Sequence, residues 1–230
     1  MKKIPTLFER EFTEDHKAIV TMPPKVISGM EWVMNGEGIA TVKIDGSCCA
    51  MINGQFYKRY DAKIGKNGVQ KPVPDGAIKC QDEPDPVTGH LPCWVLVTDK
   101  PEDKWYREAF KNAIRFETLI GINSQIKYCD WTYEAIGKHF QGNPYKLDYD
   151  ILEPHGAMKA NTLNNMSYRT SNDIKFWLQC HNVEGIVFWK DGKPQCKIKR
   201  KDFGLPWPDH ESIPISHYRL NPMISDLMKQ

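Results

Sequence analysis

Lys43 lies in the segment TVKIDGSCC, residues 41–49, where two apolar residues flank it. A strand over this segment would point Lys43 to the face opposite Val42 and Ile44. A lysine in that position can discourage edge-to-edge pairing of strands, or it can act as a nucleophile. A free lysine has a pKa of about 10.4, so only about one molecule in 2,500 carries the neutral amine at neutral pH. Burial or neighbouring cations would raise that fraction.

A carboxylate and two further lysines occur in the sequence VEGIVFWKDGKPQCKIKR. Its Asp-Gly pair is typical of a two-residue hairpin turn. Counting outward from the turn places Glu184 opposite Lys199. The same count places Ile186 opposite Lys197, so one face of the hairpin would carry a carboxylate and two ammonium groups. The proline in the second strand can perturb this register.

This predicted face favours phosphate chemistry. An exposed cross-strand salt bridge would contribute well under ~1 kcal/mol, and it would not account for two inward lysines beside Ile186. A phosphate would supply the anion that clustered lysines need, and Mg²⁺ would neutralise the carboxylate. Lys197, Lys199, Arg59 and the metal would then lower the pKa of Lys43 and stabilise charge on a phosphate under attack. The expected product is a lysyl phosphoramidate.

Four short sequences occur in an order that resembles the covalent nucleotidyltransferase superfamily of DNA ligases, RNA ligases and capping enzymes. KIDGS at 43–47 resembles the first motif of that superfamily. YEAIG at 133–137, EGIVF at 184–188 and KIKR at 197–200 resemble the third, fourth and fifth. Arg59 is similar to the arginine that follows the first motif.

The resemblance implies a role for each matching residue. Lys43 would be the nucleophile and would carry the nucleotide, and Glu184 would bind the metal. Glu134 would bind the ribose. The remaining nucleotide-binding residues would be Val42 and Arg59 beside the first motif, and the phosphate-binding Lys197 and Lys199 of the fifth.

A narrower resemblance covers residues 40–208. The segments KIDGSCC, GNPY, PHGA, EGIV and FGLPWP resemble a small family of ATP-dependent 5′–3′ RNA ligases that has a vertebrate member. It implies ATP and Mg²⁺, with Mn²⁺ as a substitute, and RNA ends bearing a 5′-phosphate and a 3′-hydroxyl as partners. The alternatives are a capping-type enzyme, a DNA ligase, or a nucleic-acid-binding module without catalysis, although an intact set of motif residues argues against the last.

Several positions are left with two interpretations each. His155 in PHGA could contact the substrate or have a structural role. Tyr149 and Trp177 are both candidates to stack on adenine, although Trp177 also fits a helix core. The basic segment 63–68 could bind pyrophosphate or be a solvated turn, and Cys180-His181 has no second ligand pair that would favour a metal.

The predicted elements must bring these residues together. Apolar spacing predicts a helix over 104–116, and Thr170 or Ser171 would cap a second helix whose buried face is Ile174, Trp177 and Leu178. The Asn53-Gly54 pair predicts a hairpin with Ile52 opposite Gln55 and, further along, Arg59 opposite Cys48. Residues 65–92, rich in Gly, Pro and Asp, are expected to form a long loop.

The expected fold is α+β: one nucleotidyltransferase domain over residues 1–230, with two antiparallel sheets and flanking helices. Lys199 is followed by 31 residues, so no OB-fold domain is expected after it.

The composition fits a globular protein. The chain is 40% hydrophobic and 26% charged, which is ordinary for a soluble domain. No apolar run reaches the length of a membrane span and the start is not a signal peptide.

The seven cysteines form no C-x-x-C pair, which favours reduced thiols in a cytoplasmic protein. Basic stretches at 58–71 and 190–201 fit a polyanionic ligand or a solvated face, and no obligate protein partner is evident.

Overall fold

The computed structural model describes residues 2–14, 18–63, 68–69, 71–86, 88–119 and 130–207. The chain divides into two compact units. The large-sheet unit contains residues 45–155 together with the start of the chain as far as Lys3. The small-sheet unit contains residues 4–44 and the chain from Gly156 onward, as far as it is described. The chain passes from one unit to the other after Ile44 and again after His155.

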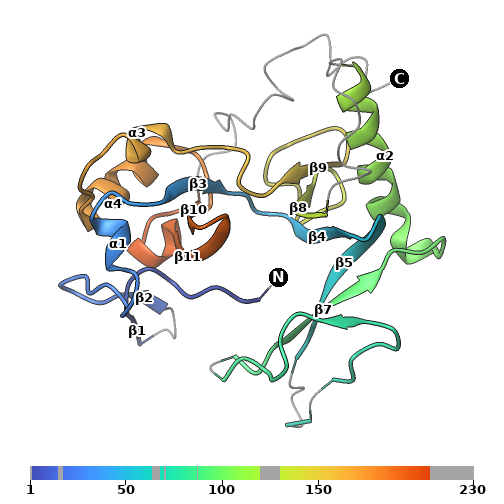
Figure 1. The fold of residues 1–230 in the computed structure, drawn as a ribbon, viewed down its shortest axis with the longest axis horizontal. Helices are drawn as coiled ribbons and strands as arrows, with labels where there is room; N and C mark the ends of the chain where they lie inside the picture. The colour runs from blue at the N-terminus through green and yellow to red at the C-terminus, as the bar shows by residue number, and fades with distance from the viewer. Residues whose placement is uncertain are drawn as a thin grey trace. The chain divides into compact units, whose positions relative to one another are not determined.

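The small-sheet unit is built on three antiparallel strands in the order β11-β10-β3. These are β3 (Ile39–Lys43), β10 (Gly185–Lys190) and β11 (Lys193–Lys199). Around them lie the hairpin β1 (Arg10–Phe12) with β2 (Ala18–Val20), and the helices α1 (Glu31–Met34), α3 (Asn161–Asn164), α4 (Ser171–Cys180) and η2 (Arg200–Phe203). Figure 1 shows α3 and α4 beside these strands.

Helix α4 confirms the predicted cap and the predicted buried face. The Thr170 side chain accepts from the Asp173 N–H and the Asp173 carboxylate accepts from the Thr170 N–H, which is a complete capping box. Ile174, Trp177 and Leu178 are buried. They pack in one hydrophobic core with Ile186 and with other side chains from the inner face of the sheet.

The β10–β11 hairpin departs from the predicted register. Next to the turn the strands pair as predicted, with Lys190 opposite Lys193. A β-bulge then interrupts the ladder between Phe188 and Trp189, and Gln195 is the extra residue on β11. The bulge falls directly after Pro194, which has no N–H to donate to a ladder.

The bulge shifts Lys197 and Lys199 by one position. Gly185, Ile186 and Val187 lie opposite Lys199, Ile198 and Lys197, respectively. The prediction that Ile186 faces Lys197 and that Glu184 faces Lys199 is therefore wrong. Ile186 and Ile198 are fully buried in the core, and the two lysines share the opposite face.

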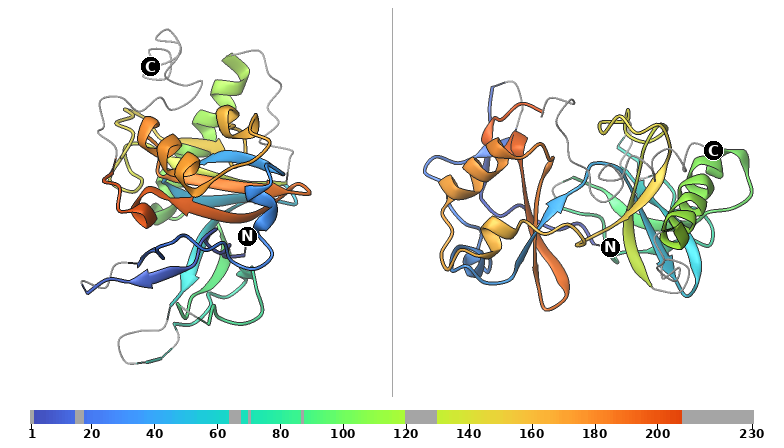
Figure 2. Two further views of the ribbon diagram at one scale, coloured as in Figure 1. Left: turned by 90° about the vertical axis from the view of Figure 1, so that its left-hand side faces the viewer. Right: turned by 90° about the horizontal axis from the view of Figure 1, so that it is seen from above.

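The large-sheet unit contains six strands in the order β6-β7-β5-β4-β8-β9, and every neighbouring pair is antiparallel. They are β4 (Ser47–Ile52), β5 (Gln55–Ala62), β6 (Ile78–Lys79), β7 (Leu91–Leu96), β8 (Trp131–Ile136) and β9 (Ile151–Pro154). The turn η1 (Pro101–Asp103) leads into α2 (Lys104–Leu119), which packs against β8 and β9. Figure 2 shows α2, in green, running beside the sheet.

The β4–β5 hairpin confirms the predicted turn. Asn53 and Gly54 have φ values of 50° and 73°, as a two-residue hairpin of this type requires. Ile52 pairs with Gln55 and Cys49 pairs with Lys58, so the next step of the ladder directs Arg59 toward Cys48. The predicted helix over 104–116 is confirmed by α2.

The architecture is mixed α/β, with several antiparallel sheets and few helices. The described residues form three sheets where two were predicted, because β1 and β2 make a separate pair. The expected long loop over 65–92 contains the short strand β6 and the start of β7. Among the residues that the structure describes, no helix is both long and apolar enough to cross a membrane. The single domain over 1–230 stays a prediction.

Candidate active site

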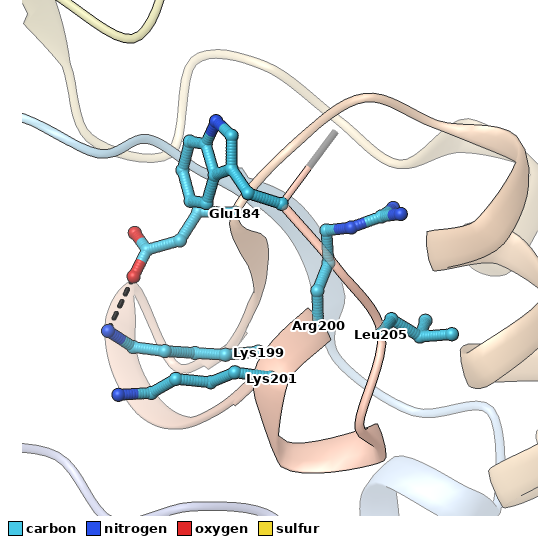
Figure 3. A pocket seen from close by; sticks show the side chains of 6 residues that line it. Glu184, Lys199, Arg200, Lys201 and Leu205 are labelled. Carbon is cyan, nitrogen blue, oxygen red and sulfur yellow. Dashed lines mark ion pairs between the residues drawn. The ribbon is translucent and has the colours of Figure 1, made fainter. Parts of the chain in front are cut away.

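Two lysines and one carboxylate meet at the end of the three-stranded sheet. The Nζ atom of Lys43 lies 2.5 Å from Oε2 of Glu184, and Lys199 forms an ion pair with the other oxygen, Oε1. The side chains of Lys43, Glu184 and Lys199 are 18%, 8% and 24% exposed. Figure 3 shows Lys199 reaching the Glu184 carboxylate. We call these three side chains the lysine–glutamate triad.

Gly185 explains how the lysine–glutamate triad forms. Gly185 pairs with Lys43 on one side and with Lys199 on the other, so both lysines leave the same face of the sheet. Their backbones are separated by two strand spacings, roughly 10 Å. No side chain stands between them, and the Glu184 carboxylate bridges the gap. A Cβ atom on Gly185 would lie 2.3 Å from the carbonyl oxygen of Ile198, so only glycine fits there.

The electrostatics of the lysine–glutamate triad favour an ionised carboxylate. Burial raises the pKa of Glu184, but the charges of Lys43 and Lys199 outweigh burial and hold the pKa below its usual value. The sequence predicted a Lys43 surrounded by cations, whereas its closest charged contact is an anion.

The edge-strand interpretation of Lys43 is partly correct. Among the described strands, β3 is at the edge of its sheet, but the Lys43 side chain is mostly buried and ion-paired rather than solvated. Val42 lies on the other face, as predicted, and packs against the core. Lys197 is two residues from Lys199 on the same strand face, opposite Val187.

A pocket beside the lysine–glutamate triad is lined by Glu184, Lys199, Arg200, Lys201, Leu205 and Trp207 (Figure 3). Arg200 has a structural role, because its guanidinium donates to the backbone carbonyls of Leu178, His181 and Pro206. Sequence reasoning assigned no site role to Lys201 or Trp207. Two signals could have indicated them: Lys201 ends the basic stretch at 190–201, and Trp207 lies in the FGLPWP segment of the family resemblance.

A second polar group lies on one face of the large sheet. Cys48 pairs directly with Glu134 across β4 and β8, and Glu134 pairs with Glu153 on β9. The Nε2 atom of His155 is 3.2 Å from Oε1 of Glu134, and its Nδ1 atom is 2.9 Å from Oγ1 of Thr132. The other carboxylate oxygen of Glu134, Oε2, is buried and has no hydrogen-bond partner. His155 therefore contacts a predicted site residue.

The two cysteines of KIDGSCC are consecutive residues of β4 and point to opposite faces of its sheet. Cys49 is fully buried, while Cys48 lies on the Glu134 face. Burial, with a smaller contribution from the negative charge of Glu134, raises the pKa of the Cys48 thiol to about 12. Burial also raises the pKa of Cys49. Both thiols are protonated at neutral pH, which disfavours either as a nucleophile.

Two cations of the basic stretch at 58–71, Lys58 and Arg59, are consecutive residues of β5 and point to opposite sides of the strand. Arg59 donates from Nε to Oδ1 of Asp61 at 2.8 Å. Lys58, which points to the opposite side of the strand, forms an ion pair with the buried Asp103. Each of these two cations is thus matched by a nearby carboxylate. The candidate pyrophosphate segment at 63–68 falls mostly outside the described residues.

The candidate adenine-stacking residues are both buried. Trp177 belongs to the core of the small-sheet unit and stacks on His181, with ring centroids 3.9 Å apart. Tyr149 is also buried. His181 Nδ1 is 2.8 Å from the Trp177 carbonyl oxygen, and neither Cys180 nor His181 belongs to a ligand cluster among the described residues.

Comparison with known proteins places the chain among the RNA ligases. The family model described as RNA ligase 1 matches residues 73–220, which is more than half of the chain. The chain belongs to the RNA ligase 1 family.

Three relatives illustrate the similarity. RNA ligase 1 of Rattus norvegicus is 25% identical over 244 residues, covering 82% of this chain and 73% of the rat protein. RNA ligase 1 of Pongo abelii is 23% identical over 98% of this chain and 86% of its own length. RNA ligase 1 of Danio rerio is 27% identical over 225 residues, covering 74% of this chain and 68% of the zebrafish protein's own length. The predicted resemblance to an RNA ligase family is confirmed.

Proposed function

We propose that the protein is an ATP-dependent RNA ligase that works through a covalent lysyl-AMP. The observation that carries this proposal is the lysine–glutamate triad, in a chain that belongs to the RNA ligase 1 family. The corresponding fold would be that of a nucleotidyltransferase.

The reaction has three steps. The neutral amine of Lys43 attacks the α-phosphorus of ATP, a P–N bond forms, and pyrophosphate leaves with the electron pair of the broken P–O bond. An oxygen of the RNA 5′-phosphate then attacks the same phosphorus and displaces Lys43, which gives an RNA-adenylate. The 3′-hydroxyl attacks the 5′-phosphate, AMP leaves, and the phosphodiester is sealed.

The lysine–glutamate triad must rearrange for the first step. Lys43 has to leave Glu184 and lose a proton before its lone pair can attack. Lys199 keeps its charge and stabilises the phosphate under attack. Glu184 offers buried carboxylate oxygens, the hard ligands that Mg²⁺ and Mn²⁺ prefer. Mg²⁺ bound there would add positive charge at the α-phosphate, and Glu184 would then neutralise the metal instead of Lys43.

Glu134 is suited to the ribose. Its Oε2 atom is buried without a partner, and a ribose hydroxyl could donate to it. Such an acceptor is costly to leave unpaired inside a protein. Arg59 and Lys197 would contact phosphates, with Val42 beside the nucleophile, as the family resemblance implies. The substrates would be RNA ends with a 5′-phosphate and a 3′-hydroxyl.

The test is adduct formation from ATP labelled at the α-phosphate, with Mg²⁺, followed by denaturation. We expect label on the wild type, and none on Lys43→Ala or Lys43→Arg, because a guanidinium stays protonated and cannot attack. Lys190→Ala is the matched control, since Lys190 is a strand lysine of the same sheet paired with Glu37 at 2.8 Å.

Parallel reactions separate the alternatives. Label from GTP alone would indicate a capping-type enzyme, and no label from either nucleotide would indicate a binding module. EDTA should abolish the adduct. Intact-mass detection of the AMP adduct on either Lys43 variant at the wild-type level would refute the assigned nucleophile.

A further inference from the structure

Cys48, Glu134 and His155 place three different ligand atoms around one point of the large-sheet unit. The thiol sulfur, a carboxylate oxygen and an imidazole nitrogen all lie within 4.8 Å of one another. β4 and β8 supply Cys48 and Glu134 from directly opposed positions. His155 follows β9, and its N–H donates to the Thr132 carbonyl at 3.0 Å. The backbone ladder therefore holds all three side chains on one face.

The ligand types favour zinc. Zn²⁺ binds thiolate, imidazole and carboxylate, and a site with three protein ligands leaves a fourth position open. Mg²⁺ prefers oxygen ligands and tolerates sulfur poorly. The site is thus distinct in chemistry from the carboxylate at Glu184.

Two further observations support a cation between these groups. Oε2 of Glu134 is buried and has no hydrogen-bond partner, and Glu134 as a whole is only 9% exposed. When Thr132 Oγ1 accepts the Nδ1 proton of His155, the Nε2 lone pair faces the Glu134 carboxylate. Such an outer partner on the second ring nitrogen is the usual arrangement of a metal-binding histidine.

We propose that Cys48, Glu134 and His155 form a Zn²⁺ site, and that occupancy of this site inhibits adenylylation. The thiol proton leaves to solvent when the metal binds. The inhibition rests on the proposed function, because Zn²⁺ would engage the carboxylate that we assign to the ribose. The metal binding itself does not depend on it.

The binding test uses the full chain with Zn²⁺ in competition with a chromogenic chelator, and with Co²⁺ as a spectroscopic probe. We expect a thiolate-to-cobalt charge-transfer band for the wild type. Cys48→Ser should lose this band, and Cys48→Ser and His155→Asn should each bind Zn²⁺ at least ~10-fold more weakly. Cys180→Ser, an exposed cysteine next to a histidine, is the matched control and should bind as the wild type does.

A second measurement does not depend on the variants folding. Alkylation of the partly buried Cys48 requires transient local opening of the large-sheet unit. Bound Zn²⁺ should slow this alkylation in the wild type, and mass spectrometry can locate the label on Cys48. The site is refuted if Cys48→Ser and Cys180→Ser bind Zn²⁺ equally, or if Co²⁺ gives no thiolate band.

The inhibition test measures lysyl-AMP formation at increasing Zn²⁺ and several ATP concentrations. ATP should relieve the inhibition of the wild type, and Cys48→Ser should need ~10-fold more Zn²⁺ for the same effect. Zinc bound through Cys48 with no effect on adenylylation would overturn the inhibitory role. If the wild type forms no adduct at all, the proposed function fails, and the Zn²⁺ affinities alone decide the site.

Discussion

Glu184 holds the two lysines whose charges the proposed reaction needs at different times. Its carboxylate pairs with Lys43, the proposed nucleophile, and with Lys199 at once. The lysine–glutamate triad is therefore a resting arrangement, and binding of the nucleotide with its metal would release Lys43 from it. In the proposed reaction Lys199 and Glu184 would both lie close to the bound phosphates.

Glu184→Gln should destabilise the fold by about 2 kcal/mol near pH 7, because charged hydrogen bonds to both lysines are lost. Folding lowers the pKa of Glu184 from its ordinary value of 4.5. The contribution of the ionised carboxylate to the free energy of unfolding is therefore complete above about pH 4.5. The contribution declines as the pH falls below 4.5 and is lost as the pH passes through the folded pKa. Denaturant unfolding of both proteins across this range measures the difference.

The control is Glu37→Gln, which breaks the more exposed pair with Lys190 and should cost less than ~1 kcal/mol. The assigned charge of Glu184 would be contradicted if the difference in unfolding free energy between the wild type and Glu184→Gln stayed constant from neutral to acidic pH.

Glu134→Ala and Lys199→Ala should fail in different ways. Without the Glu134 carboxylate the enzyme should discriminate less between ATP and 2′-deoxy-ATP, because the partner of the missing hydroxyl is already gone. Lys199→Ala and Lys197→Ala should keep the wild-type sugar preference and react more slowly, since phosphate charge is less well neutralised. Single-turnover adenylylation with ATP and with 2′-deoxy-ATP distinguishes a loss of sugar discrimination from a loss of rate. Loss of the sugar preference in the lysine variants instead would overturn these assignments.

At the scale of the element, β10 determines the site. It is the central strand of its sheet, and its first residue, Gly185, is the position across which Lys43 and Lys199 face each other. The bulge at Gln195 of β11 sets which face of the sheet Lys197 and Lys199 occupy. The backbone also approaches closely at Gly46 in the large-sheet unit, where a Cβ would lie 2.6 Å from the Ala135 carbonyl oxygen.

Gly185→Ala should disrupt the lysine–glutamate triad without changing any of its members. The added Cβ would be 2.3 Å from the Ile198 carbonyl oxygen and 3.0 Å from the Lys199 Cα. β11 would have to move, at a cost of about 1–3 kcal/mol. We expect a lower melting temperature and slower adenylylation.

Gly192→Asn is the matched control in the same hairpin. Nothing lies within 4 Å of a Cβ there, and asparagine tolerates the positive φ of 70°. Equal adenylylation rates for the two variants would show that close approach at Gly185 does not position the lysines.

At the scale of the whole molecule, the chain forms two units with separate cores. The core of the small-sheet unit unites α4 with the inner faces of β10 and β11. In the same unit Arg169 is fully buried and donates to the carbonyls of Leu163, Val33 and Glu37. These bonds connect α1, α3 and the segment that precedes β3 through one side chain. The large-sheet unit has hydrophobic clusters of its own.

Ile174→Ala should loosen the small-sheet unit more than the large-sheet unit. Ile174 is fully buried in the α4 core, and such a truncation costs about 2–5 kcal/mol. Native-state hydrogen exchange should show a larger loss of protection in β10 and β11 than in β4 and β8. Phe176→Ala, on the same helix but 67% exposed, should leave both units unchanged. An equal loss in both units would mean that they unfold as one.

The sequence by itself determined the features that depend on near neighbours. The Thr170 cap, the buried stripe of α4 and the Asn53-Gly54 turn were all predictable, because caps and two-residue turns are decided within about four residues. The motif residues were recognisable for the same reason, since KIDG, EGIV and KIKR each lie within a few consecutive positions.

Tertiary structure decided what depends on pairing between distant segments. The bulge after Pro194 moved Lys197 and Lys199 by one position, and period-two counting cannot foresee an extra residue in a strand. The bridging of Lys43 and Lys199 by Glu184 required β3 to pair with β10. The meeting of Cys48, Glu134 and His155 required β4, β8 and β9 to be neighbours. A side chain's own sequence context does not specify which strand lies beside it, because strand order is decided by packing of the whole sheet.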